Sequence, residues 1–285
     1  MQSGQQVADS GTKSFESGGL NISFRYWHPG ERPSGAVVII PGFNSHSGYY
    51  EWVGNQLTAA GIAAYALDLR GRGQSDGERF YVEQFADYVS DVAGLIATVN
   101  PESPGTPTFL LGHSAGGVIA CLYALDHQSE IAGLICESFA FELPAPDLAL
   151  AVLKGISHLA PHAHVLQLNN EDFSRDPATV ERMNADPLIA HETQSSETVA
   201  ELVRADERLR NEFAAISLPL LILHGTADKA AKPAGSELFY EQAGSKDKTL
   251  KLYEGTFHDP LNDLDKETVI SDIRDWLHAR LSTGR

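Results

Sequence analysis

The stretch from Thr108 to Ala120 contains a serine whose neighbours point to chemistry. An apolar run leads into Gly-x-Ser-x-Gly, with Ser114 at its centre, and small and aliphatic residues with helical potential follow. Gly112 and Gly116 permit a strand-to-helix turn that is too tight for a side chain at either position. Such a turn exposes the Ser114 Oγ above a sheet and points the free N–H groups of the helix toward it. Ser114 is therefore predicted to act as a nucleophile once a histidine takes its proton.

A candidate acid and a candidate base follow the serine along the chain. Asp228 comes after the apolar run 219–223, and His258 comes after the predicted strand 249–253. The carboxyl ends of parallel strands meet at one edge of a sheet, and serine, acid and histidine in this order are typical of one strand–helix scaffold, the α/β-hydrolase fold. The pattern predicts that His258 deprotonates the serine and that Asp228 orients His258.

Other roles for these residues stay open at this point. Asp228 could instead be a turn or cap residue, since aspartate is common there, and His258 could be an ordinary loop histidine. Glu137 also ends a predicted strand, 131–136, and competes with Asp228 for the role of the acid. A structural role is the plainer interpretation of Glu137.

The oxyanion formed in an acyl transfer needs two hydrogen-bond donors. One is the backbone N–H of Ala115, directly after the nucleophile. The other is expected from the loop after the apolar run 36–40, where Phe43 is suitably placed. Both assignments rest on position alone, because backbone donors leave no side-chain signature.

Two further clusters look like binding sites but are not interpreted as such. Three histidines have metal-like spacing, but Pro161 interrupts any helix that would align them, so no metal is predicted. These are His158, His162 and His164. The glycine-rich loop 68–77 lacks the Gly-Lys-Ser/Thr ending of a phosphate-binding loop and is predicted to be a structural turn.

Short apolar runs alternate with helical patterns over most of the chain. This alternation predicts an α/β fold of the α/β-hydrolase type, with a mainly parallel central sheet and helices on both faces. The predicted strands are 20–27 at a sheet edge, then 36–40, 61–67, the run before Gly112, 131–136, 218–223 and 249–253. The predicted helices are 49–60, 82–99, one beginning at Ala115, 148–159, 195–210, 234–243 and 266–281.

The rhythm of strands and helices stops at residue 140 and resumes after residue 213, which predicts a helical insertion. The domain organisation is therefore a mobile tail (1–17), the first part of the core (18–139), a helical cap insertion (140–213) and the second part of the core (214–285). The cap is rich in aliphatic residues. Leu150 and Leu153 are expected to line the substrate entrance above Ser114.

The bulk composition excludes several classes of protein. With 42% hydrophobic and 21% charged residues the chain reads as a globular domain, and no window approaches the 18 consecutive apolar residues of a membrane span. The N-terminus is polar, without the apolar core of a secretory signal. Cys121 and Cys136 lie in apolar segments, which favours a reducing cytoplasmic location. A formal charge of −17 disfavours nucleic acid and anionic membranes as partners.

Taken together, the motifs are similar to those of a known family. The chain resembles the monoacylglycerol lipase and lysophospholipase branch of the α/β-hydrolases, which is also grouped with the serine aminopeptidases. The resemblance extends from about residue 34 to residue 281 and rests on 46–50, 68–73, 75–79, 112–117, 174–177, 186–188, 219–228 and 257–258. The chain departs from the family at Pro41, where the family has histidine, at Ala115, where it has methionine, and at Cys136-Glu137-Ser138, where a more neutral stretch is usual.

The resemblance implies the same nucleophile, acid, base and oxyanion donors, and a lipid-facing cap. It implies a serine carboxylic-ester hydrolase that works through an acyl-enzyme, needs no cofactor and takes a small-molecule substrate such as a monoacylglycerol or lysophospholipid. Three alternatives remain: a short-chain carboxylesterase, a non-catalytic ligand-binding protein on the same fold, and a peptidase of the aminopeptidase type. The peptidase would hold its substrate's amino group with Glu192, Glu197 or Glu201.

Overall fold

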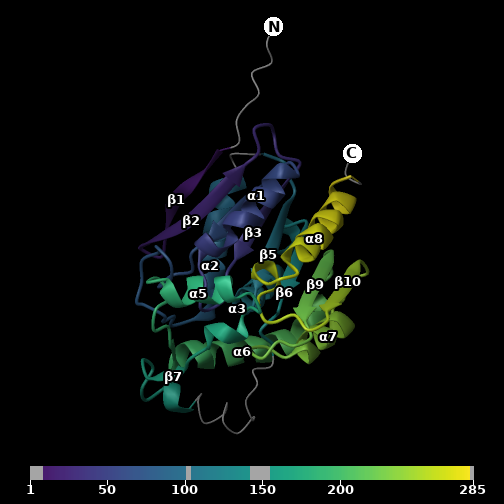
Figure 1. Cartoon of the computed structure of the whole chain (residues 1–285). Coiled ribbons are helices and arrows are strands. Elements are labelled where there is room, and N and C mark those ends of the chain that lie inside the picture. The colour runs from purple at the N-terminus through teal and green to yellow at the C-terminus, as the bar shows by residue number, and fades with distance from the viewer. Residues whose placement is uncertain (1–8, 101–103, 142–154, 283–285) are drawn as a thin grey trace.

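Eight strands form one sheet that runs through the molecule (Figure 1). The computed structural model describes residues 9–100, 104–141 and 155–282. The strand order is β1-β2-β4-β3-β5-β6-β9-β10; β1 and β2 run antiparallel to their neighbours, and all other pairs are parallel. The bounds are β1 (Asp9–Ser17), β2 (Leu20–His28), β3 (Gly35–Ile40), β4 (Ile62–Leu67), β5 (Thr108–His113), β6 (Gly133–Glu137), β9 (Leu220–Gly225) and β10 (Lys248–Tyr253).

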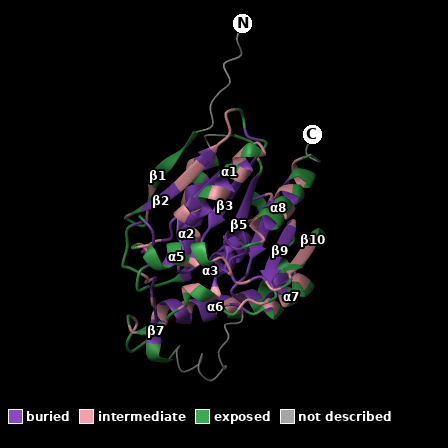
Figure 2. Ribbon diagram, viewed as in Figure 1, coloured by how far each residue is buried: buried purple, intermediate pink, exposed green. Residues whose placement is uncertain are grey.

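Helices cover both faces of this sheet because the central strands are apolar on both faces. Alternate residues of β3 enter different cores: Val38 lies in the core that also includes residues of α2, α3 and α7, whereas Val37 lies in the core that also includes residues of α1 and α8. Figure 2 shows the buried residues concentrated in the strands and the helix faces against them. The helices are α1 (Glu51–Ala59), α2 (Phe85–Val99), α3 (Ala115–His127), α7 (Pro233–Gln242) and α8 (Lys266–Leu281). The predicted fold class is confirmed.

The prediction of a mobile tail over 1–17 is wrong for residues 9–17. They form β1, which pairs with β2 along its whole length, so that β2 is not the edge strand it was predicted to be. The composition of β1 is polar and its side chains are mostly exposed, which hid it from a search for apolar runs. Its anchor is Phe15, whose ring lies 6.1 Å from the ring of Phe24 and rests against Gly94 of α2.

The segment between β6 and β9 lies outside the large sheet. Residues 155–215 of this segment are called the insertion below; they contain β7 (His164–Leu166), η4 (Asn170–Asp172), α5 (Pro177–Ala185), β8 (Gln194–Ser195), α6 (Ser196–Glu212) and η5 (Phe213–Ala215). Figure 1 shows α6 crossing one end of the sheet, opposite the end where α8 stops. It buries Leu202, Ala205 and Leu209 in the same core as α2 and α3. Leu150 and Leu153 lie outside the described residues.

Candidate active site

Ser114 lies on a sharp turn between β5 and α3. Its φ of 55° is in the left-handed region, which a residue other than glycine adopts only under strain. A Cβ at Gly116 would collide with the carbonyl oxygen of Ile40, so the start of α3 passes against β3 more closely than a side chain permits. The Ser114 N–H donates to the carbonyl of Glu137, 2.9 Å away. Local sequence thus holds the serine at the end of β5, with its Oγ toward His258.

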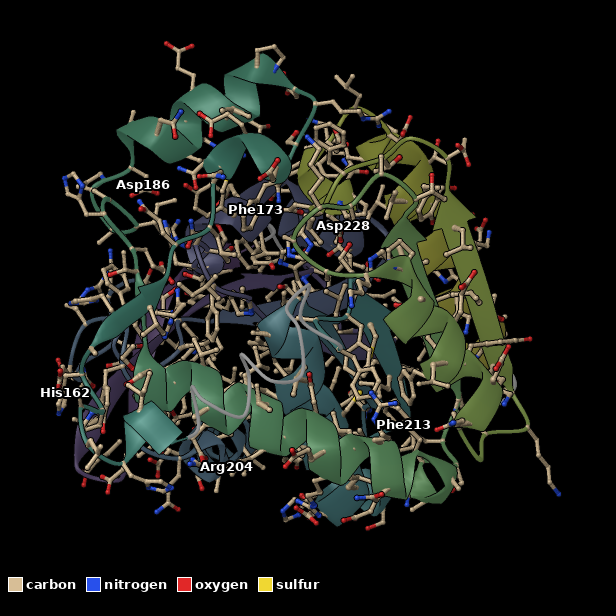
Figure 3. The ribbon with its side chains drawn as sticks, turned by 90° about the horizontal axis from the view of Figure 1, so that it is seen from below. His162, Phe173, Asp186, Arg204, Phe213 and Asp228 are labelled. Atoms are coloured by element: carbon tan, nitrogen blue, oxygen red, sulfur yellow. The ribbon has the colours of Figure 1, made fainter. Side chains whose placement is uncertain are left out.

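The structure brings Ser114, His258 and Asp228 together. His258 Nε2 lies 2.8 Å from Ser114 Oγ, and His258 Nδ1 lies 2.7 Å from Asp228 Oδ2. A proton on Nδ1 donates to the carboxylate and leaves Nε2 as the acceptor for the serine hydroxyl. Phe173 of the insertion packs edge-on against the His258 ring, with the centroids 5.0 Å apart. Figure 3 shows Phe173 and Asp228 toward the middle of the view and His162 at the rim.

The surroundings of Asp228 keep it ionised. Burial on its own raises the pKa of this carboxyl, but the charge of His258 and hydrogen bonds from His224 and His258 outweigh burial and hold the pKa well below its usual range. Asp228 Oδ1 also accepts the N–H groups of Ala230 and Ala231 at 2.8 and 2.9 Å. His224 Nε2 lies 3.0 Å from Oδ2. Sequence reasoning missed His224, although its place four residues before Asp228 was a usable signal.

The loop after β3 supplies the second predicted oxyanion donor. A Cβ at Gly42 would lie 2.7 Å from the Cβ of Ser114, so only glycine lets this loop approach the nucleophile. Phe43 follows it, and its N–H donates no hydrogen bond within the described part of the chain. Ala115 is the first residue of α3, where an N–H has no acceptor inside its own helix. Within the described ranges neither amide has an acceptor, as the predicted oxyanion role requires.

A buried arginine connects this loop to the insertion. The Arg72 guanidinium lies 4.3 Å from the centroid of the Phe43 ring. Arg72 donates to Tyr88 at 2.7 Å, to Glu192 at 3.2 Å and to Gln194. The loop 68–77, predicted to be a structural turn, thus also carries Arg72, which packs on Phe43 in the loop after β3.

A second tie uses two of the motifs on which the resemblance rested. Asp186 accepts hydrogen bonds from His46 at 2.8 Å and from Tyr49 at 3.0 Å. Burial raises the pKa of Asp186, but the hydrogen bonds from His46 and the Leu188 N–H prevail and the pKa is lowered. The loop after β3 is therefore tied to the insertion through His46 and Tyr49, and Arg72 stacks on Phe43 while it pairs with Glu192 of the insertion.

Glu137, the competing acid, does not reach the histidine. It ends β6 with its side chain fully buried, and Oε1 accepts the N–H of Leu261 at 2.8 Å. Burial, and then the charge of Asp259, raise the pKa of Glu137 well above its ordinary value. Of the two candidate acids, Asp228 is the one at His258 Nδ1.

The three spaced histidines do not converge. His162 pairs with Glu78 at 2.8 Å, and His164 pairs with Thr193 at 2.5 Å.

Across the described ranges, no helix has both the length and the apolar character that crossing a membrane requires.

Comparisons with known proteins agree with this geometry. Residues 31–265 match the family described as serine aminopeptidase, S33. The chain is 32% identical over 266 residues to the monoacylglycerol lipase of Mycolicibacterium smegmatis, covering 93% of this chain and 95% of the relative. It is 33% identical over 271 residues to the monoglyceride lipase of Homo sapiens, covering 93% of this chain and 89% of the relative. The crystal structure of the Paleococcus ferrophilus monoacylglycerol lipase superposes with a TM-score of 0.82 at 29% identity, over 91% of this chain and 99% of that one.

The family match covers most of the chain and includes all three residues that meet at the turn after β5. The resemblance drawn from the motifs is thereby confirmed. By its family match, its close relatives in sequence and its fold, this chain belongs to the serine aminopeptidase S33 family of α/β-hydrolases.

Proposed function

We propose that this protein is a serine ester hydrolase that cleaves acylglycerols or similar acyl esters through an acyl-enzyme. The observation that carries the proposal is the hydrogen-bonded series from Ser114 Oγ through His258 to Asp228, at 2.8 and 2.7 Å. Ser114, the nucleophile of this series, lies on a strained turn, and the N–H groups of Phe43 and Ala115 are the proposed donors to the oxyanion. The relatives named monoacylglycerol and monoglyceride lipase support an acylglycerol as the substrate class.

In the proposed reaction the same groups act in both half-reactions, acylation of Ser114 and hydrolysis of the acyl-enzyme. His258 Nε2 takes the hydroxyl proton as Ser114 Oγ attacks the ester carbonyl carbon, and the N–H groups of Phe43 and Ala115 hold the oxyanion. The carbon–oxygen bond to the alcohol then breaks, and the alcohol leaves with the proton from Nε2. Water, deprotonated by His258, attacks the acyl carbon; the bond from that carbon to Ser114 Oγ then breaks, His258 returns the proton to Oγ, and the carboxylic acid is released. Asp228 stays ionised throughout and stabilises the imidazolium.

The glutamates that a peptidase would need to bind the substrate's amino group already pair with arginines. A free substrate amine needs an unpaired carboxylate, but Glu192 is paired with the buried Arg72. Glu197 and Glu201 both accept from Arg204, at 2.8 and 2.6 Å. A carboxylate already neutralised by an arginine offers little to a second cation, so an uncharged ester fits this site better than an amino-terminal peptide.

A chromogenic ester and a chromogenic anilide separate these functions. We expect purified protein to hydrolyse p-nitrophenyl butyrate and to leave an amino-acid p-nitroanilide intact, with Ser114→Ala as the control for contaminating esterases. Faster cleavage of the anilide would make the protein a peptidase, and failure to cleave either compound would favour a ligand-binding protein.

We also expect acyl-chain length to govern the rate. Leu150 and Leu153 are proposed to contact the acyl chain, because the sequence from 143 to 168 holds more aliphatic residues than one packed helix face needs. Each methylene removed from water gains about 0.8 kcal/mol, so kcat/KM should rise about four-fold per carbon over the first several carbons. The measurement is a series of p-nitrophenyl esters and monoacylglycerols.

Serine at Leu150 or Leu153 should flatten that rise with little change in melting temperature. Leu252→Ser on β10, where the side chain is 41% exposed, is the matched control and should keep the wild-type slope. A rate that falls steadily from acetate onward would replace the lipase-like function with that of a short-chain esterase.

A cytoplasmic location is also proposed. Its support is the pair of buried free cysteines, Cys121 and Cys136, whose sulfur atoms lie 3.6 Å apart as thiols. Labelling of the native and unfolded protein with a thiol reagent should find both cysteines protected before unfolding and reactive after it.

A further inference from the structure

Glu137 is a buried acid that the proposed reaction does not use. It occupies the last position of β6, in register with His113 of β5 on one side and Leu223 of β9 on the other. Its backbone carbonyl accepts the N–H of Ser114 at 2.9 Å, and its side chain accepts the N–H of Leu261 at 2.8 Å. One residue therefore contacts both the nucleophile and the loop that carries the histidine.

The loop of His258 is held by the insertion, where the carbonyl oxygens of Asp172 and Phe173 accept the N–H groups of His258 and Asp259 at 3.5 and 2.8 Å, and by two ties from the sheet. Leu261 belongs to η6 (Pro260–Asn262), a single turn directly after the histidine, and the N–H groups of a first turn have no acceptor within the turn. The Glu137 carboxyl supplies that acceptor from another strand. His113 supplies a second tie, since its Nε2–H donates to the carbonyl oxygen of His258 at 3.1 Å. Two neighbouring strand ends thus hold the histidine loop at two points.

We propose that Glu137 is a positioning residue for the catalytic histidine: its side chain fixes the loop 258–261 and so sets the distance between His258 Nε2 and Ser114 Oγ. This inference rests on the proposed role of His258 as the base. Glu137 contacts neither the substrate nor the reacting atoms; it acts through the Leu261 N–H and the turn that follows His258.

The surroundings of Glu137 favour the neutral form of its side chain, although the Leu261 N–H on its own lowers the pKa. A ring nitrogen of His113 and one carboxyl oxygen each of Glu137 and Asp259 lie within 4.8 Å of one another, and all three residues are buried. Tyr50 and Tyr253 also lie near enough to interact with an ionised Glu137, but neither tyrosine can supply a positive charge to stabilise it. An ionised Glu137 would therefore face Asp259 with only His113 to compensate, and burial also raises the pKa of Glu137 and lowers that of His113. As a neutral acid, Glu137 accepts from Leu261 without repelling Asp259.

This protonation state gives a pH-dependent signature. As the pH rises, the unfolded chain releases the Glu137 proton near the ordinary pKa of 4.5, whereas the folded protein retains it. The contribution of Glu137 to stability is therefore complete below that pH and is lost progressively as the pH rises toward the folded pKa. Glu137→Gln has the same shape and cannot ionise. The melting temperature of Glu137→Gln minus that of the wild type should therefore rise by about 2–4 °C per pH unit as the pH increases above 4.5 toward the folded pKa.

The positioning role is tested by kinetics per active site, counted by titration with an active-site phosphonate. Glu137→Gln keeps an acceptor for the Leu261 N–H and should retain kcat within about three-fold of the wild type. Glu137→Met fills similar space without an acceptor, and Glu137→Asp keeps the acid but withdraws it by one methylene. Both should lose about 10- to 100-fold in kcat with KM changed less than about three-fold, because a small displacement of His258 affects the reaction more than binding.

The exposed Glu237 of α7 serves as the matched control, with the same glutamine and methionine substitutions and no expected change. Equal kcat for wild type and Glu137→Asp would overturn the proposal, as would a glutamine variant as impaired as the methionine variant. If Glu137→Met does not fold, the aspartate variant still decides. The pH dependence of the melting temperature needs no enzyme activity, so a wild-type protein without esterase activity would reject the proposed function and leave the protonation of Glu137 testable.

Discussion

Ser114→Ala should abolish ester hydrolysis and leave the fold intact. The hydroxyl is the atom that bonds to the acyl group, so its removal should lower kcat by about 10⁴- to 10⁶-fold, the usual range for loss of a triad member. The structure offers little reason for instability. The side chain is small, its Oγ contacts His258, and the turn at φ 55° strains alanine and serine alike.

The measurement is hydrolysis of p-nitrophenyl butyrate by wild type and variant purified side by side. Mass spectrometry after reaction with a fluorophosphonate should find the label on Ser114 in the wild type and on no residue of the variant. A melting temperature within about 2–3 °C of the wild type would confirm that the fold is retained. Retention of more than a few per cent of the wild-type rate in a clean preparation would contradict the assignment of the nucleophile.

The turn at Ser114 was predictable because its causes are local. Two glycines, an apolar strand before them and a helix after them lie within one short stretch, and the close approach of Gly116 to β3 follows from them. Asp228 and His258 were predictable for a related reason. Each follows a predicted strand, and parallel strands bring their carboxyl ends to one edge whatever their spacing along the chain.

The supports of the site were not predictable, because their partners are distant in sequence. Arg72 pairs with Glu192 across 120 residues, and Glu137 meets the Leu261 N–H across 124. The residues next to a buried arginine or a buried glutamate in the sequence do not indicate which distant group will neutralise its charge or complete its hydrogen bonds. The edge strand β1 was missed for a different reason: its stability comes from backbone pairing and a single phenylalanine, and no apolar alternation marks it.

Asp228→Asn should cost about 10⁴-fold in kcat with only a small change in KM. The orientation of the new side chain is set by its surroundings. Two backbone N–H groups, from Ala230 and Ala231, point at Oδ1 and will select the asparagine oxygen. The amide nitrogen then faces His258 Nδ1 as a donor. Nδ1 must become an acceptor, the proton moves to Nε2, and Nε2 can no longer take the proton of Ser114.

Glu137→Gln is the matched comparison, because it makes the same carboxylate-to-amide change at the other candidate acid. Its glutamine oxygen can still accept the Leu261 N–H, and its carboxyl is neutral in the wild type, so the histidine keeps its tautomer. Assayed on the same ester at the same pH, the glutamine variant should remain within about three-fold of the wild type while the asparagine variant loses about 10⁴-fold. The reverse ranking would make Glu137 the acid that orients His258. Because both variants replace a carboxyl group with an amide of the same shape, a general loss of stability would lower the two rates together and cannot produce the expected separation.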